Sequence, residues 1–201
     1  PDASSLNINS SLGIISFNSA PDYENENTYC GGWCEIIVSV TDGDNTVSQN
    51  ITVNITNLND NAPVISSSAT FNAAENQTSV RTVSASDADG DALTYSLSGT
   101  DASSFSINGS SGVITFNSAP DYESKSSYSI TISVSDGTTT TNQSITVNVT
   151  GVNDNPVITS SATFSVDENQ TSVGTVTASD ADGDALTYSL SGTDASSFSI
   201  S

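Results

Sequence analysis

Basic residues are almost missing from this sequence. Its 201 residues include 23 Asp and Glu against two Lys and Arg and no His, which gives a formal net charge of −21. Such a surface repels the phosphate backbone of nucleic acids and the anionic lipids of membranes, so we expect neither as a partner. Without His there is no imidazole base, and no Gly-rich phosphate loop is present. The sequence therefore gives little support to catalysis.

Long apolar runs and cysteines are scarce as well. No run of 18 apolar residues occurs, so no transmembrane helix is predicted, and no basic segment before an apolar one marks a signal peptide. Only two Cys are present, and Ser, Thr and Asn are abundant. This composition suits a secreted or surface protein better than a cytosolic enzyme. We expect an extracellular or cell-surface location.

The sequence repeats itself. The stretch 84–107 returns almost unchanged as 177–200, at an offset of 93 residues (177 − 84), and 2–8 is another version of 101–107. Repeats of this length indicate stacked structural units. We expect the first unit to keep its later strands and the third its earlier ones. The predicted units are the C-terminal part of a first repeat (1–62), a complete repeat (63–155) and the N-terminal part of a third (156–201).

Apolar residues in the complete repeat alternate with Ser and Thr at period two, as in half-buried strands. Ile130, Ile132 and Val134 fall on one face of such a run, and no helical period is found. Seven short strands predict an all-β fold, namely an immunoglobulin-like Greek-key β-sandwich. The strands are expected at 64–74, 79–86, 93–98, 104–108, 113–117, 127–135 and 143–150.

The first repeat contains a five-residue insertion around Cys30-Gly-Gly-Trp33-Cys34. Three intervening residues, two of them Gly, can bend enough for the cysteines to meet, so a Cys30–Cys34 disulfide is predicted. Two interpretations of Trp33 stay open. In the first, it is exposed at the tip of the loop and contacts a sugar or a neighbouring chain. In the second, the disulfide is a local cross-link that holds Trp33 against its own domain.

The carboxylates recur at fixed positions. Sixteen of the 23 acidic residues fall in short recurring motifs, whereas a general acidic coat would scatter them. The linkers Asn59-Asp-Asn61 and Asn153-Asp-Asn155 add further oxygens, and a Pro after each one stiffens the exit. Calcium takes six to eight oxygen ligands, more than one repeat offers by itself. We therefore expect cation sites at the junctions, with an acidic, salt-tolerant surface as a contributing cause.

Five of these motifs, taken in order, resemble the calcium-binding motifs of cadherin repeats. The sequence around them is most similar to the cadherin-like repeats of large bacterial surface proteins. The resemblance implies tandem β-sandwiches joined by Ca²⁺-binding linkers. The implied role is a structural or adhesive rod or filament whose partners are neighbouring repeats or copies of the same protein. The motifs are Glu75 in Ala-Glu-Asn-Gln, Asp87-Ala-Asp89, Asp121-Tyr-Glu123, Asp136-Gly and Asn153-Asp-Asn155.

The resemblance also implies one set of metal ligands at each junction. Asn57 and Gly151 depart from the family, whose linkers open with an acidic residue. Asp91 and Asp184 are either further ligands or parts of a tight acidic turn, and Asp42 and Glu168 are expected to serve other junctions. The first set is Asp22, Glu24, Asn59, Asp60, Asn61, Asp87, Asp89 and Asp136. The second is Glu75, Asp121, Glu123, Asn153, Asp154, Asn155, Asp180 and Asp182.

Two other functions remain open at this point. One is a binding module that recognises surface glycans or proteins through the Trp33 loop. The other is an accessory region of a secreted enzyme whose catalytic part lies elsewhere.

Overall fold

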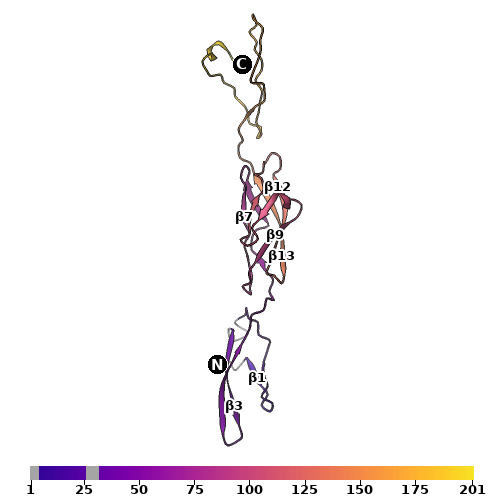
Figure 1. The fold of residues 1–201 in the computed structure, drawn as a ribbon, viewed down its shortest axis with the longest axis vertical. Coiled ribbons are helices and arrows are strands. Elements are labelled where there is room, and N and C mark those ends of the chain that lie inside the picture. Colours follow the sequence, from indigo (N-terminus) through magenta and orange to yellow (C-terminus); the bar gives the residue numbers. More distant parts are fainter. Residues whose placement is uncertain (1–4, 26–31) are drawn as a thin grey trace.

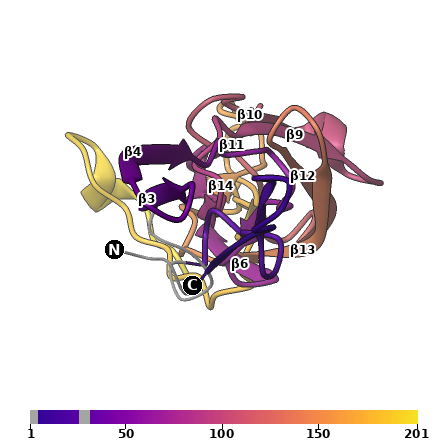
Figure 2. The same cartoon turned by 90° about the horizontal axis from the view of Figure 1, so that it is seen from below.

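The computed structural model describes residues 5–25 and 32–201. The molecule is elongated, with three parts following one another along its long axis (Figure 1). Viewed along that axis, the three parts overlap (Figure 2). We call them the first part (1–62), the middle part (63–155) and the third part (156–201). Among the described residues, no helix has the length and apolar character needed to cross a membrane.

The middle part is a sandwich of two sheets. One has the strand order β6-β13-β12-β9, the other β10-β11-β7, and β5 and β8 form a short additional pair. β13 runs parallel to β6, whereas its pairing with β12 on the other side is antiparallel. The strands are β5 (Val64–Ile65), β6 (Thr70–Ala74), β7 (Ser79–Thr82), β8 (Ala85–Ser86), β9 (Thr94–Ser98), β10 (Phe105–Ile107), β11 (Val113–Phe116), β12 (Ser127–Ser135) and β13 (Thr140–Thr150), with the 3-10 helix η1 (Ala102–Ser104) before β10.

The apolar core lies between these two sheets. Alternate residues of β12 point inward, so Ile130, Ile132 and Val134 are buried, and the same holds for Ile145 and Val147 of β13. Burying one such side chain contributes about 1.5–3 kcal/mol. The opposite sheet adds two phenylalanine rings that pack on each other and on a tyrosine of β12. These rings are Phe105, Phe116 and Tyr128.

The immunoglobulin-like sandwich predicted from the period-two pattern is confirmed. The segment 64–74, expected as one strand, is two strands that join different sheets, because its central Ser-Ser-Ser-Ala run has no large apolar residue to hold it in either. The amide of Ser66 donates to the carbonyl of Ser84 at 2.9 Å, where the chain crosses. The segment 79–86 divides in the same way into β7 and β8.

The described residues of the first part, 5–25 and 32–62, form two antiparallel pairs, β1–β2 and β3–β4. A small cluster of buried residues, Leu6, Cys34 and Ile36, joins them. The third part has one described strand pair, β14–β15, and most of its residues are exposed. Division of the chain into repeats at 62 and 155 stays a prediction. The elements are β1 (Leu6–Ile8), β2 (Ile15–Phe17), β3 (Trp33–Thr41), β4 (Thr46–Asn54), β14 (Val157–Ile158), β15 (Ala178–Ser179) and the 3-10 helix η2 (Ala195–Ser197).

The insertion lies partly outside the described residues. Cys30 is one of the residues left out, so the disulfide with Cys34 stays a prediction; Cys34 itself is completely buried. Trp33 is the first residue of β3, opposite Asn54, and half of its surface is exposed. It therefore belongs to a strand and is not the tip of a loop. The carbonyl of the preceding Gly32 accepts a hydrogen bond from the amide of Ile55 at 2.9 Å.

Candidate metal centres at the two junctions

Glu75 connects three segments at the end of the middle part. It follows β6 directly, and its side chain is only 2 % exposed. Its Oε2 atom accepts a hydrogen bond from the amide of Tyr122 at 2.7 Å, and its Oε1 atom accepts one from the amide of Val152 at 2.6 Å. A buried carboxylate needs such donors. The bonds hold the 121–123 turn and the start of the second linker against β6.

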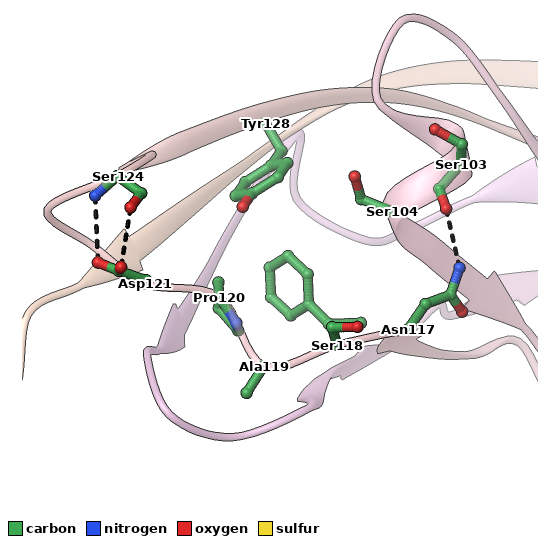
Figure 3. A pocket seen from close by; sticks show the side chains of 10 residues that line it. Ser103, Ser104, Asn117, Ser118, Ala119, Pro120, Asp121, Ser124 and Tyr128 are labelled. Carbon is green, nitrogen blue, oxygen red and sulfur yellow. Dashed lines mark hydrogen bonds between the residues drawn. The ribbon is translucent and has the colours of Figure 1, made fainter.

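Three carboxylates converge at this second junction. Ligand oxygens of Glu75, Asp121 and Glu123 all lie within 4.8 Å of one another. Ser124 donates to Asp121 from its hydroxyl at 2.8 Å and from its amide at 3.1 Å (Figure 3), and these bonds lower the pKa of Asp121. Partial loss of hydration at the junction, together with the charges of Glu75, Asp182 and Asp121, raises the pKa of Glu123 although its side chain is largely exposed. Like charges held this closely favour a cation between them.

The second linker contacts both of its neighbours. Asp182 of the third part accepts a hydrogen bond from the amide of Asp154 at 2.6 Å. The Oδ1 atom of Asp154 accepts one from the side chain of Asn76, in the middle part, at 3.2 Å. Asn153 donates its side-chain amide to the carbonyl of Asp154 at 2.9 Å. The linker aspartate is therefore bonded from both sides.

The first junction collects carboxylates from all three of its components. Oxygens of Glu24 from the first part, Asp60 from the linker and Asp89 from the middle part lie within 4.8 Å of one another. The side-chain amide of Asn61 donates to each of them, at 3.4 Å to Glu24 and 3.0 Å to the two aspartates. One amide group cannot neutralise three carboxylates, so the arrangement retains an excess of negative charge.

The carboxylate of Asp89 accepts several hydrogen bonds from the first linker. The amides of Asp60 and Asn61 donate to its Oδ2 atom at 3.2 and 2.9 Å. Burial opposes ionisation of Asp89, but these bonds and the side chain of Asn61 lower its pKa. For Glu24 burial prevails, with repulsion from Asp89 and Asp60, and its pKa is raised. The side chain of Asn57 adds a bond to the carbonyl of Asp89 at 2.8 Å.

Several oxygens of the first junction are buried without a hydrogen-bond donor. Of the five buried side-chain polar atoms that have no partner among the described residues, three belong to predicted ligands: Glu24 Oε1, Asn59 Oδ1 and Asp87 Oδ2. Leaving such atoms unpaired is costly unless a cation takes the place of the donor. A further set, Asp87, Asp89 and Asp91, also has oxygens within 4.8 Å of one another. The donor set therefore fits a hard, oxygen-binding cation.

Some predicted ligands are bonded within their own turns. Asp136 accepts the amides of Thr139 and Thr138 at 2.6 and 2.7 Å, which lowers its pKa, while its backbone carbonyl accepts the side chain of Asn59 at 3.3 Å. Asp22 accepts two amides of its own turn. Asp180 accepts the amide of Asp184 at 3.0 Å, and Asn155 is exposed. A ligand role for these residues stays a prediction.

Sequence reasoning missed three asparagine contacts: Asn57 to Asp89, the central position of Asn61 among three carboxylates, and Asn76 to Asp154. A signal for the last was present. Asn follows the strand glutamate in both the middle and the third part, and Asn76 and Asn169 adopt left-handed φ angles of 61° and 65°. Asn tolerates that conformation better than most residues, so its recurrence marks a tight turn beside the glutamate.

A hollow of about 350 Å³ lies beside Asp121 and is lined by Phe116, Pro120 and Tyr128 among others (Figure 3). The side chain of Asn117 on its wall is already engaged. Its amide donates to the carbonyl of Ser103 at 2.9 Å and its oxygen accepts the hydroxyl of Ser106 at 2.6 Å. These bonds fix the segment that leads from β11 to Asp121.

The sequence of the middle part matches the Cadherin domain family over residues 68–150. Residues 68–150 are a cadherin domain. The similarity to cadherin repeats stated from the five motifs is thus confirmed, and with it the cadherin-type sandwich as the fold of the chain.

Two relatives are similar in sequence to about two thirds of this chain. Chitinase A of Pseudoalteromonas piscicida is 36% identical over 132 residues, which cover 65% of this chain and 16% of that protein. Protocadherin Fat 4 of Mus musculus is 35% identical over 135 residues, which cover 62% of this chain and 3% of that protein. This chain therefore spans a small fraction of either relative.

Solved cadherin structures superpose on most of this chain. Mouse cadherin-23 EC22–24 superposes with a TM-score of 0.60 and 26% identity over 88% of this chain and 61% of that one. Human CDH23 EC21–23 gives a TM-score of 0.65 and 22% identity over 90% of this chain and 63% of that one, which shows the fold alone. The cadherin fold therefore extends beyond residues 68–150.

Proposed function

We propose that this chain is a segment of an extracellular rod or filament, stiffened by calcium ions at the junctions between its cadherin-like repeats. The observation that carries the proposal is the first junction. There, oxygens of Glu24, Asp60 and Asp89 from three successive segments converge within 4.8 Å. Three predicted ligands of this junction also have a buried oxygen without a donor. The role is architectural: the segment sets spacing and stiffness, and it serves adhesion.

Calcium acts on the relative position of the repeats. In its absence the clustered carboxylates repel one another, and the linker is held by hydrogen bonds alone. A cation that binds only to the ordered junction stabilises it by about 2.7 kcal/mol at a hundredfold excess over its dissociation constant. Flexible joints therefore become rigid when calcium is supplied.

The composition and the cadherin domain support a secreted or cell-surface location, where calcium is abundant and nucleic acids are not partners. Neighbouring repeats or other copies of the protein are the partners we propose. A net charge of −21 opposes contacts between copies, so such contacts need cations that screen or bridge the carboxylates.

A calcium titration of the whole chain tests the proposal. We expect isothermal titration calorimetry to detect heat of calcium binding. In small-angle X-ray scattering, we expect calcium to increase the maximum dimension of the molecule and to narrow the range of its conformations. Asp60→Asn should weaken both effects. Asp44→Asn, in the exposed turn after β3, changes the same charge away from the junctions and should leave them unchanged. Absence of calcium binding at millimolar calcium in the unaltered chain would refute the proposal.

A second function is favoured by the similarity to a chitinase. Chitinase A is 36% identical over 65% of this chain, so repeats of this kind occur within an enzyme. This chain would then be an accessory region that carries a catalytic domain or contacts its substrate. The half-exposed ring of Trp33 is the side chain suited to stacking on a sugar.

Retention on chitin beads tests this second function. Retention that is lost in Trp33→Ala and kept in Trp33→Phe would support it, because phenylalanine preserves a stacking face. Equal recovery of all three proteins in the unbound fraction would exclude glycan binding through Trp33.

A further inference from the structure

The outer face of β12 and β13 carries small polar side chains. Across the middle part, which is described throughout, the outward residues of these two strands are all Ser, Thr or Asn. Ser127 pairs with Asn148 and Ser129 pairs with Thr146 at one end of this face. The neighbouring strand β9 pairs only with residues 131–135 of β12. That end of the face is therefore open to solvent in a complete sandwich.

The corresponding face of the first part has the same β4 side and a different β3 side. Thr52 and Asn54 of β4 stand where β13 has Thr146 and Asn148. On β3, three larger residues replace small hydroxyl side chains. The replacements are Trp33 for Ser127, Glu35 for Ser129 and Ile37 for Thr131. The two repeats thus share a backbone surface but differ in the side chains they present on it.

The strand register brings four of these side chains together. Trp33 pairs with Asn54, and Glu35 pairs with Thr52. Residues that pair across antiparallel strands point to the same side of the sheet, with Cβ atoms about 4.5–5.5 Å apart. The side chains between them, such as Cys34, point inward and are buried. An indole ring, an amide, a carboxylate and a hydroxyl therefore share one exposed surface.

The polar groups on this surface have no partner within the described chain. The side chains of Glu35, Thr52 and Asn54 make neither a hydrogen bond nor an ion pair with any described residue. In the middle part, the hydroxyl of Ser127 donates to the side-chain oxygen of Asn148 at 3.5 Å, so the equivalent amide is engaged. Water fills the free positions, and a ligand with hydroxyl and amide groups can replace that water.

We propose that the outer face of β3 and β4 binds a neutral oligosaccharide of N-acetylated sugars. The inference rests on the second function proposed above and gives it a built site. The half-exposed ring of Trp33 stacks on the apolar face of one sugar ring, and the free polar groups beside it bond the substituents of that ring. The residues of the site are Trp33, Glu35, Ile37, Asn50, Thr52 and Asn54.

The arrangement of the site matches the acetamido group. Each apolar side chain of β3 lies opposite an amide of β4, Trp33 opposite Asn54 and Ile37 opposite Asn50. An acetamido group also combines a methyl with an amide. Its amide can exchange one donated and one accepted hydrogen bond with an Asn side chain, while its methyl contacts the apolar neighbour. The two pairs lie about 14 Å apart along the strand, so the ligand is longer than one sugar.

The charge of the face selects a neutral ligand. Glu35 lies between the two apolar residues of β3, where its carboxylate accepts hydrogen bonds from sugar hydroxyls. The same carboxylate, in a chain of net charge −21, repels uronic acids and sulfated sugars. Anionic polysaccharides are therefore disfavoured at this face.

The apolar area of the face is small for a protein partner. Trp33 is 52% exposed and Ile37 is 65% exposed. Since an aromatic side chain buries about 150–250 Å², the two exposed portions together offer on the order of 200 Å². A stable protein interface buries about 800 Å² on each partner. One stacking surface with several hydrogen-bonding groups suits a chain of sugars better.

Binding of chitohexaose to the whole chain tests the proposal. Trp33 is the only Trp in the sequence, so a change in its fluorescence reports on this face, and isothermal titration calorimetry gives the affinity. We expect saturable binding of chitohexaose and about tenfold weaker binding of cellohexaose, which has no acetamido group to pair with the amides. Equal affinity for the two sugars, or tighter binding of an anionic oligogalacturonate, would overturn the proposal.

Two variants that keep Trp33 separate the site from the ring alone. Asn54→Ala and Glu35→Ala should each weaken chitohexaose binding about three- to tenfold, because each removes hydrogen bonds to the sugar. Asn148→Ala, at the equivalent position of the middle part, is the matched control and should bind like the unaltered chain. Unchanged affinity in both Asn54→Ala and Glu35→Ala would contradict the proposal.

The middle part allows a gain-of-function test. Ser127→Trp, Ser129→Glu, Thr131→Ile and Ser144→Asn together build the same face on β12 and β13, where the remaining two polar residues are already present. In a chain that also carries Trp33→Ala, these four substitutions should restore chitohexaose binding. A grafted chain that shows the ordinary unfolding transition but does not bind would refute the assignment of the site.

The outcomes distinguish this site from the function on which it rests. Retention on chitin beads that is lost in Trp33→Ala, but unaffected in Asn54→Ala and Glu35→Ala, leaves the second function standing and removes this site. Absence of any chitin binding by the unaltered chain removes both. Neither result bears on the calcium-stiffened rod, which is measured by calcium titration.

Discussion

The carboxylate of Glu75 and the backbone amide of Val152 are joined by a 2.6 Å hydrogen bond, although 77 residues separate them in sequence. Together with the bond from the amide of Tyr122, this contact fixes where the second linker leaves the middle part. The residue has a structural role that does not require a metal ion. Its effect on folding and its effect on calcium binding can therefore be measured apart.

Glu75→Ala should destabilise the middle part even in EDTA, by about 1–3 kcal/mol, because two backbone amides lose their buried acceptor. Glu123→Gln is the matched variant, since its side chain is exposed and belongs to the same carboxylate cluster. We expect it to leave the unfolding transition in EDTA unchanged and to weaken only the stabilisation by calcium. Chemical denaturation with and without calcium measures both, and equal behaviour of the two variants in EDTA would contradict the role of Glu75.

Calcium affinity should fall in mild acid. The pKa values of Glu24 and Glu123 are raised, first by partial loss of hydration and then by neighbouring carboxylates. As the pH falls towards these raised values, both side chains take up protons that compete with the cation, before ordinary glutamates do so. Calcium isotherms at pH 7, 6 and 5 should show progressive weakening. Affinity that is constant over this range would place both side chains outside the site.

Without calcium the dependence on pH has the opposite sign. A raised pKa means that the folded chain binds more protons than the unfolded one in the window between the ordinary and the raised value. The contribution of Glu24 and Glu123 is therefore fully present below the ordinary value of about 4.3 and is lost as the pH rises through the raised one. Melting curves in EDTA should show junctions more stable at pH 5 than at pH 7, and those in calcium the reverse.

Asp101 provides an acid-sensitive contact away from the metal centres. The ammonium group of Lys125 and then the amide of Ser129 lower the pKa of Asp101. A lowered pKa gives stability that is present above the ordinary value of about 3.9 and is lost as the pH falls through the lowered one. Lys125→Met should shift acid unfolding of the middle part to higher pH. Ser124→Ala leaves the Lys125–Asp101 pair in place, so the stability that Asp101 contributes should be lost over the same pH range as in the unaltered chain.

The two junctions should differ in stiffness. Asn57 bonds the carbonyl of Asp89 across the first junction, whereas its counterpart Gly151 has no side chain. Asn57→Gly should therefore broaden the distance distribution between spin labels placed in the first and middle parts. Gly151→Asn does not simply restore the bond at the second junction, because a Cβ atom there would lie 3.2 Å from the ring of Tyr122. The double variant Gly151→Asn, Tyr122→Ala should stiffen that junction. If the distance distributions of the two single variants and of the double variant are all unchanged, the asparagine at this position does not stiffen the junction.

Truncation of a core side chain should lower the free energy of unfolding much more than truncation of an outer-face side chain on the equivalent strand. Ile132 is completely buried, so Ile132→Ala should cost about 2–5 kcal/mol of middle-part stability. Ile37 is 65% exposed on β3, and Ile37→Ala should change stability by no more than about 0.5 kcal/mol. Calorimetry should show the first substitution moving the main transition and the second leaving it in place.

Most of the fold could be predicted from the sequence, because the apolar residues that recur at period two are the ones that are buried in the strands. In β12 every second residue is apolar, and the observed strand has the predicted bounds of 127–135. β13 begins at 140, three residues before the predicted start at 143. Polar Thr140 to Asn142 give no period-two signal there, although their backbones pair with β12. Strands held only by backbone bonds are invisible to hydrophobic patterning.

The sequence names both the acidic residues and the linker asparagines of the candidate site, but it does not predict the hydrogen bonds that those asparagines make. Recurrence identifies Glu24, Asp60 and Asp89 as a set, because each motif returns in the next repeat. It cannot reveal that the Asn61 amide lies between them, since that depends on the turn of the linker relative to two domains. The bonds from the amides of Thr138 and Thr139 to the Asp136 carboxylate were missed for a different reason, since they depend on the local conformation of the turn after β12.

The parallel pairing of β6 with β13 has a mechanical consequence. The chain enters the sandwich just before β6 and leaves it directly after β13, and the two strands run side by side in the same direction. Tension applied to the two ends pulls these strands past each other along their length. Their hydrogen bonds are then loaded in shear, all together, and do not open one at a time. A molecule under flow or traction would resist stretching within each sandwich and yield first at the linkers.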